Sequence, residues 1–112
     1  MVQEDFDKSA GLACVDGDES LYEAVLAVFH EQLTGEFAAL GDALRQGADE
    51  QTTRQVHTLK GSAGSVGAKR LEAAAAAIDR QLKSGAPTPD ESLVAELEAA
   101  MRSAAASLRA MG

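Results

Sequence analysis

The stretch that decides the fold of this chain is Val56-His57-Thr58-Leu59-Lys60-Gly61-Ser62-Ala63-Gly64. Its apolar residues recur at spacings of three and four, which predicts a helix with one apolar face. Two glycines interrupt the pattern, although glycine costs about 1 kcal/mol relative to alanine inside a helix. Glycines kept beside a histidine at this cost suggest that something large approaches the imidazole closely.

The polar residues of this stretch share the opposite side of the predicted helix. Successive helical residues turn by about 100°, which places the histidine, lysine and glycine positions on average roughly 135° from the apolar stripe. We therefore expect His57 on the solvent side. Lys60 and Gly61, at i+3 and i+4, are its neighbours on the helix surface.

Amphipathic patterns lie on both sides of this central helix. The predicted helices cover about residues 3–14, 19–46, 50–65, 68–83 and 90–111, with a loop at 84–89. Within the second, Gly35 and Gly41 weaken the pattern without ending it. Asp18 and Asp49 are the predicted N-caps of the second and third helices. Gly67 is predicted to end the third.

The composition points to the same class of fold. Apolar residues make up 46% of the 112 residues, mostly Ala and Leu, and aromatic residues only 4%. This length fits a single domain over residues 1–112. Short loops place successive helices side by side in opposite directions. The sequence therefore predicts an all-α protein, an antiparallel up-down four-helix bundle.

The distribution of charge restricts the partners. The net charge is -8, which disfavours nucleic acid and anionic membrane surfaces as partners. Residues 51–71 nevertheless contain four basic side chains and no Asp or Glu. We expect this stretch to form a basic patch around His57. Such a patch suits an anion that arrives at the imidazole or forms on it.

The remaining reactive side chains suggest no cofactor or metal. Cys14 is the single cysteine, and we expect it to be a small buried apolar residue. His30 has neither a lysine at i+3 nor a neighbouring glycine, so a structural or surface role is expected. The chain has no recognisable metal-ligand spacing. It also has no signal peptide and no membrane-spanning apolar run, so we expect a cytoplasmic protein.

The chemistry of an exposed histidine beside a lysine fits phosphoryl transfer. Imidazole has an ordinary pKa of about 6.5, so a histidine at neutral pH is largely an uncharged nucleophile. Phosphoryl transfer needs mainly positioning and charge neutralisation. Lys60 would pair with phosphoryl oxygens while the glycines leave room for the donor's active site.

The run from His57 to Ala63, followed by Gly67-Ala68, resembles the core motif of histidine-containing phosphotransfer (HPt) domains. The resemblance extends from about Gly11 to Leu82. It implies a four-helix bundle with a short accessory N-terminal helix. It also implies a carrier that accepts a phosphoryl group from a receiver-domain aspartyl-phosphate and passes it to another receiver.

The resemblance assigns roles by position. His57 would be phosphorylated, Lys60 would steady the phosphoryl group, and Gly61 would permit close docking. The family usually has Gln or Glu near the histidine on the next helix, where this chain has the shorter Asp79. A docking role and a packing role remain open for Gly64.

The implied partners are response-regulator receiver domains and a hybrid histidine kinase, with Mg²⁺ on the receiver only and this chain as a monomer. Thr58 follows the histidine where a kinase dimerisation helix normally has an acidic residue. We therefore expect a phosphocarrier that does not phosphorylate itself from ATP, rather than an enzyme. The alternatives are the phosphoacceptor domain of a chemotaxis-type histidine kinase and a non-catalytic receiver-binding module.

Overall fold

The chain folds into six helices in a computed structural model that describes residues 6–86 and 88–111. No strand occurs among these residues, and none of their helices has the length and apolarity needed to cross a membrane. The helices are α1 (Lys8–Ala13), α2 (Glu19–Thr34), α3 (Leu40–Arg45), α4 (Glu50–Val66), α5 (Lys69–Lys83) and α6 (Glu91–Met111).

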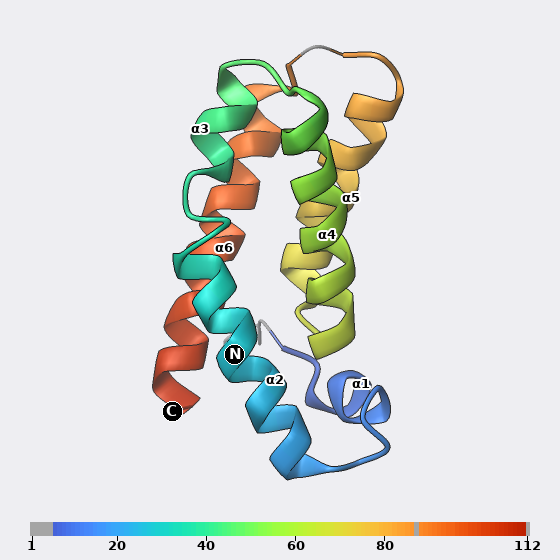
Figure 1. Cartoon of the computed structure of the whole chain (residues 1–112), viewed down its shortest axis with the longest axis vertical. Coiled ribbons are helices and arrows are strands. Elements are labelled where there is room, and N and C mark those ends of the chain that lie inside the picture. Colours follow the sequence, from blue (N-terminus) through green and yellow to red (C-terminus); the bar gives the residue numbers. More distant parts are fainter. Residues whose placement is uncertain (1–5, 87, 112) are drawn as a thin grey trace.

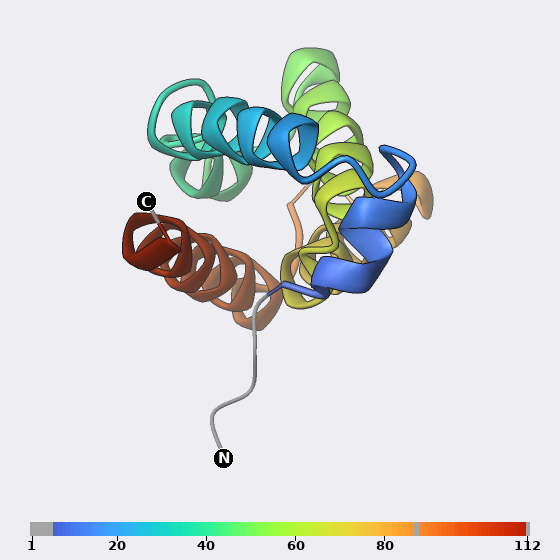
Figure 2. The same cartoon turned by 90° about the horizontal axis from the view of Figure 1, so that it is seen from below.

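The helices form a bundle whose long members alternate in direction. In Figure 1, α2 and then α3 run upward on one side, α4 runs down, α5 runs up and α6 returns to the bottom. The most extensive packing joins α4 to α5, followed by α5 to α6. The short helix α1 packs against α4 and α2 at one end, as the view along the bundle shows (Figure 2). The predicted all-helical bundle is thus confirmed.

The N-terminal segment holds the turn between α4 and α5. The backbone N–H of Asp7 donates a hydrogen bond to the carbonyl of Gly67 at 2.6 Å, and its carboxylate caps α1 through Ala10. The hydroxyl of Tyr22 on α2 donates to the carbonyl of Val66 at 2.9 Å. These contacts fix the C-terminal end of α4. The first helix was predicted over residues 3–14; residues 3–5 lie outside the described residues, and α1 itself is shorter.

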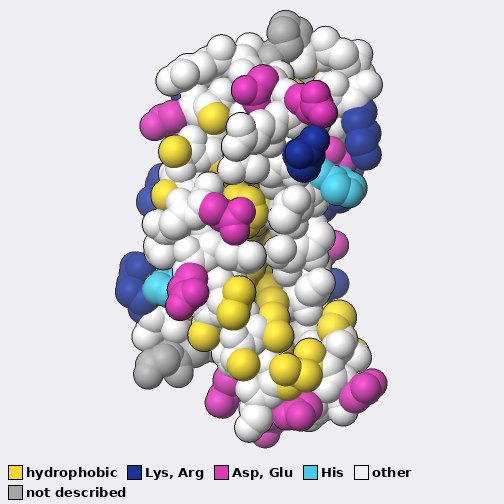
Figure 3. All heavy atoms as spheres, viewed as in Figure 1, with side chains coloured by type: hydrophobic (Ala, Val, Ile, Leu, Met, Phe, Trp, Pro, Cys, Tyr) yellow, Lys and Arg dark blue, Asp and Glu magenta, His cyan; other side chains and the backbone are white. Residues whose placement is uncertain are grey.

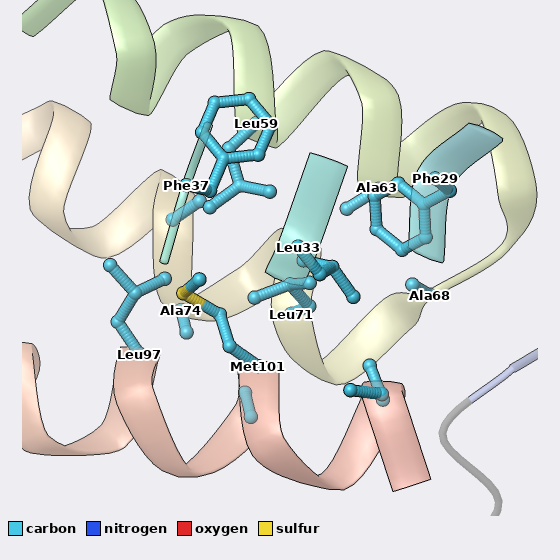
Figure 4. Close-up of a cluster of buried hydrophobic side chains, with 14 of the residues drawn as sticks. Phe29, Leu33, Phe37, Leu59, Ala63, Ala68, Leu71, Ala74, Leu97 and Met101 are labelled. Atoms are coloured by element: carbon cyan, nitrogen blue, oxygen red, sulfur yellow. The ribbon is translucent and has the colours of Figure 1, made fainter. Parts of the chain in front are cut away.

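A single apolar core fills the bundle, and part of it is drawn in Figure 4. Side chains from α2, α4, α5 and α6 meet there. Each large aliphatic or aromatic side chain that is fully buried contributes roughly 1.5–3 kcal/mol to the free energy of folding. The largest fully buried side chains are Phe29, Phe37, Leu40, Leu44, Leu59, Leu71, Ile78, Leu97, Val56, Val66 and Val94.

The prediction of one helix over residues 19–46 was wrong. Helix α2 ends at Thr34, and Gly35 has φ -112° and ψ -96°, a non-helical conformation that is cheap for glycine. The N–H of Phe37 then donates to the carbonyl of Gln32 at 2.9 Å, which turns the chain. This turn buries the Phe37 ring completely before α3 begins.

The other helix boundaries agree with the sequence. The carboxylates of Asp18 and Asp49 accept hydrogen bonds from the backbone N–H groups of Leu21 and Thr52, as N-caps do. Gly67 ends α4 with φ 78°, in the left-handed region that favours glycine. Along α6, Val94 is fully buried, while the side chain of Leu93 is only half-buried.

The prediction that Cys14 is buried was also wrong, since its side chain is exposed. Helix α1 has only six residues, and Gly11 is the one that it buries against the rest of the molecule. Cys14 follows the helix as its C-cap and turns to solvent. His30 is half-buried on α2, in keeping with a structural role.

Candidate functional site

The site is built on α4, whose rotation about its own axis is fixed by its ends and its buried face. At its start, Asp49 accepts the backbone N–H of Thr52 at 2.8 Å, and this hydrogen bond holds the pKa of the Asp49 carboxyl below its usual value. Val56, Leu59 and Ala63 are completely buried. The opposite side of α4 must therefore face solvent at the positions between them.

His57 lies on that outer side and is exposed, as predicted. Among residues 6–86 and 88–110, no hydrogen bond or ion pair engages its imidazole. Both ring nitrogens are consequently available to an incoming group. An uncharged imidazole carries one nitrogen with a free electron pair, which is the atom that can attack an electrophile.

Gly61, one helical turn after His57, is exposed and borders open space. A Cβ atom built at this position would meet no atom of the described residues within 4 Å. The internal packing of the protein therefore gives no reason for a glycine here. The missing side chain matters only to something that approaches from outside, which agrees with the close approach inferred from the sequence.

Lys60 is held by a buried carboxylate on the neighbouring helix. Its Nζ lies 2.9 Å from Oδ2 of Asp79, whose side chain is only 3% exposed, whereas that of Lys60 is 30% exposed. The Nζ of Lys83 approaches the same oxygen at 3.0 Å. Burial raises the pKa of the Asp79 carboxyl, but the hydrogen bonds from the two lysines outweigh it, so the pKa lies below its usual value. Asp79 is thus an ionised group with two cationic partners.

Asp79 contacts the lysine of the motif and not its histidine. Within the described chain, its side-chain hydrogen bonds and ion pairs go to Lys60 and Lys83. The packing of α4 on α5 brings residue 79 level with residue 60, and the short side chain of Asp79 reaches the ammonium group of Lys60. Sequence reasoning missed Lys83, although its i+4 spacing from Asp79 on one helix was a readable signal.

Gly64 has a packing neighbour, unlike Gly61. A Cβ atom here would lie 2.7 Å from Oε2 of Glu72 on α5. The absent side chain therefore leaves room for a carboxylate between two helices of the same molecule. Because that carboxylate is the end of a flexible side chain that is 39% exposed, it can move aside, and this contact alone does not require glycine at position 64.

The basic stretch does not form an unpaired patch. Figure 3 shows acidic and basic side chains interspersed on one face of the molecule. Each of the four cations lies within 4.0 Å of a carboxylate that belongs to a residue outside 51–71. The pairs are Arg54–Glu50, Lys60–Asp79, Lys69–Glu72 and Arg70–Glu96. The basic side chains of residues 51–71 therefore do not form a broad unpaired positive surface around His57.

The Asp79 ion pairs make the stability of the protein depend on pH. Because the pKa is lowered on folding, the stabilisation is complete above the unfolded value of about 3.9 and is lost as the pH falls through the folded value. We expect Asp79→Asn to cost about 1–2 kcal/mol at pH 7, with the difference from wild type shrinking below about pH 4. Urea unfolding across this pH range measures it, and a pH-independent difference would contradict the assignment.

No group of three or more His, Cys, Asp or Glu side chains within the described residues is arranged to hold a metal ion. The functional features that the structure does bring together are the exposed His57, Lys60 beside it, open space over Gly61, and the buried carboxylate behind the lysine.

Comparison with known proteins agrees with this arrangement. The family model of the Hpt domain matches residues 24–107, which include all of α3, α4 and α5 and most of α2 and α6. No curated protein matches the chain. The match covers most of the sequence and includes His57, Lys60, Gly61 and Asp79. The chain therefore belongs to the Hpt domain family, whose members act in histidine phosphotransfer in two-component signalling.

Proposed function

We propose that this protein is a phosphorelay intermediate that accepts a phosphoryl group on His57 from one receiver domain and passes it to another. The observation that carries the proposal is an exposed imidazole that no described residue engages by a hydrogen bond or ion pair, with a lysine at i+3 and open space over the glycine at i+4. The partner contributes the aspartyl-phosphate and its Mg²⁺. The domain itself contributes the nucleophilic imidazole, the lysine ammonium group and the open space through which the receiver reaches them.

The transfer step uses the uncharged form of His57. The lone pair of its unprotonated ring nitrogen attacks phosphorus, an N–P bond forms, and the P–O bond to the receiver's aspartate breaks. The bonding electrons leave with the aspartate, which becomes a carboxylate. The ring, now positively charged, returns to neutrality when the proton on its other nitrogen goes to solvent. Transfer to the next receiver reverses these events.

Lys60 is the group that neutralises charge on the phosphoryl oxygens in this proposal. It follows His57 by three residues on one helix face, and nearly a third of its side chain is exposed. Its ion pair with Asp79 keeps the ammonium group near the helix surface.

The test is a transfer experiment with a receiver domain whose aspartate carries labelled phosphate. We expect label to move onto this protein in a bond that is stable to alkali and labile to acid, as an N–P bond is. Label that arrives only from ATP through a separate kinase domain would instead favour a chemotaxis-type phosphoacceptor. Binding of the receiver with no label on this protein would favour a non-catalytic interaction module.

A further inference from the structure

One buried carboxylate in this protein has two lysine partners of different accessibility. Lys60 comes from α4 with its side chain 30% exposed, and Lys83 comes from the last turn of α5 with its side chain 64% exposed. Both ammonium groups lie within 3.0 Å of Oδ2 of Asp79. The second lysine has no part in the function described above, so its place on the same oxygen calls for an explanation.

The two lysines differ in their positions along the chain relative to His57 and Asp79. Lys60 shares a helix face with His57 and can turn toward a phosphoryl group there. Lys83 sits four residues after Asp79 on the same helix, so it stays beside the carboxylate whatever Lys60 does. When Lys60 turns away, the Asp79 side chain remains only 3% exposed, and a buried charge without a partner is strongly destabilising.

We propose that Lys83 is a positioning residue for phosphoryl transfer, which keeps Asp79 paired while Lys60 moves from that carboxylate to the phosphoryl group on His57. This inference rests on the proposed function. In this proposal Lys83 acts through Asp79 and not by a contact of its own with the phosphoryl group. Without it, Lys60 would be the sole counter-charge of a buried carboxylate and would be held away from the phosphoryl oxygens.

The test compares phosphoryl transfer from a labelled receiver domain in three variants. Lys83→Gln should slow labelling of the protein about tenfold and lower the labelled fraction at equilibrium, whereas Lys83→Arg should restore both. Lys69→Gln is the matched control, because it removes the same charge from an exposed position on α5 whose carboxylate neighbour is not Asp79. Equal behaviour of Lys83→Gln and Lys69→Gln would overturn the proposal.

A double-mutant cycle separates this role from a direct contact between Lys83 and the receiver. In an Asp79→Asn background no buried charge needs a partner, so adding Lys83→Gln should have no further effect on the rate. A persistent tenfold effect in that background would overturn the proposal. Circular dichroism of each variant verifies the fold. If wild-type protein takes up no label, the proposed function itself fails, which is a distinct outcome.

Discussion

We expect a His57→Gln variant to take up no label from a phosphorylated receiver domain and to keep the wild-type fold. Glutamine keeps a polar side chain of similar size but has no nucleophilic nitrogen, because its amide electron pair is delocalised. The imidazole is exposed, and the described chain offers it no hydrogen bond. We therefore expect the free energy of unfolding to change by less than about 0.5 kcal/mol. Labelling and thermal unfolding of the same preparation measure both quantities.

His30→Gln is the matched control, since it alters the only other histidine of the chain. That residue is half-buried on α2, its Nε2 is buried with no hydrogen-bond partner among the described residues, and the position at i+3 holds a leucine in place of a lysine. It should accept label at the wild-type rate. Label on His57→Gln, or loss of label from a folded His30→Gln protein, would show that the assigned acceptor is wrong.

The sequence predicts those parts of the fold that depend on local interactions. Asp49 as an N-cap and Gly67 as a stop are readable because each acts within one turn of its own helix. The break after α2 is different, since Leu33, Phe37 and Leu40 keep spacings of four and three across it. Periodicity alone cannot distinguish a continuous helix from one that ends at a glycine and resumes with the same residues facing inward.

The same distinction between local and distant geometry governs the site. His57, Lys60 and Gly61 fall on one helix face by spacing alone, so their arrangement follows directly from the sequence. The partner of Lys60 depends on how α4 packs against α5 and on the length of the Asp79 side chain. The expected basic patch failed only partly for a related reason. Lys60 and Arg70 pair with carboxylates that other helices bring beside them, whereas the partners of Arg54 and Lys69 lie on their own helices just outside the counted stretch.

Gly61→Leu should severely slow phosphoryl transfer in a protein that is no less stable than wild type. Open space surrounds the position, so a leucine side chain fits the isolated domain, and replacing a helical glycine gains up to about 1 kcal/mol. In the complex that side chain would stand one turn from His57 and push the receiver away. Displacement of reacting atoms by about 1 Å can cost roughly 100-fold in rate, so we expect at least this loss in the labelling rate.

Comparison of Gly61→Ala with Gly61→Leu separates the effect of side-chain size on transfer from the effect of replacing glycine in the helix. Alanine gives the same relief of backbone entropy with a far smaller side chain, so its transfer rate should lie between those of wild type and the leucine variant. Ala106→Leu controls for an added exposed leucine, because residue 106 is exposed on α6, a helix that does not pack against α4. Equal transfer rates for the Gly61→Leu and Ala106→Leu variants would show that the receiver does not approach over Gly61. The glycine would then not be explained by docking.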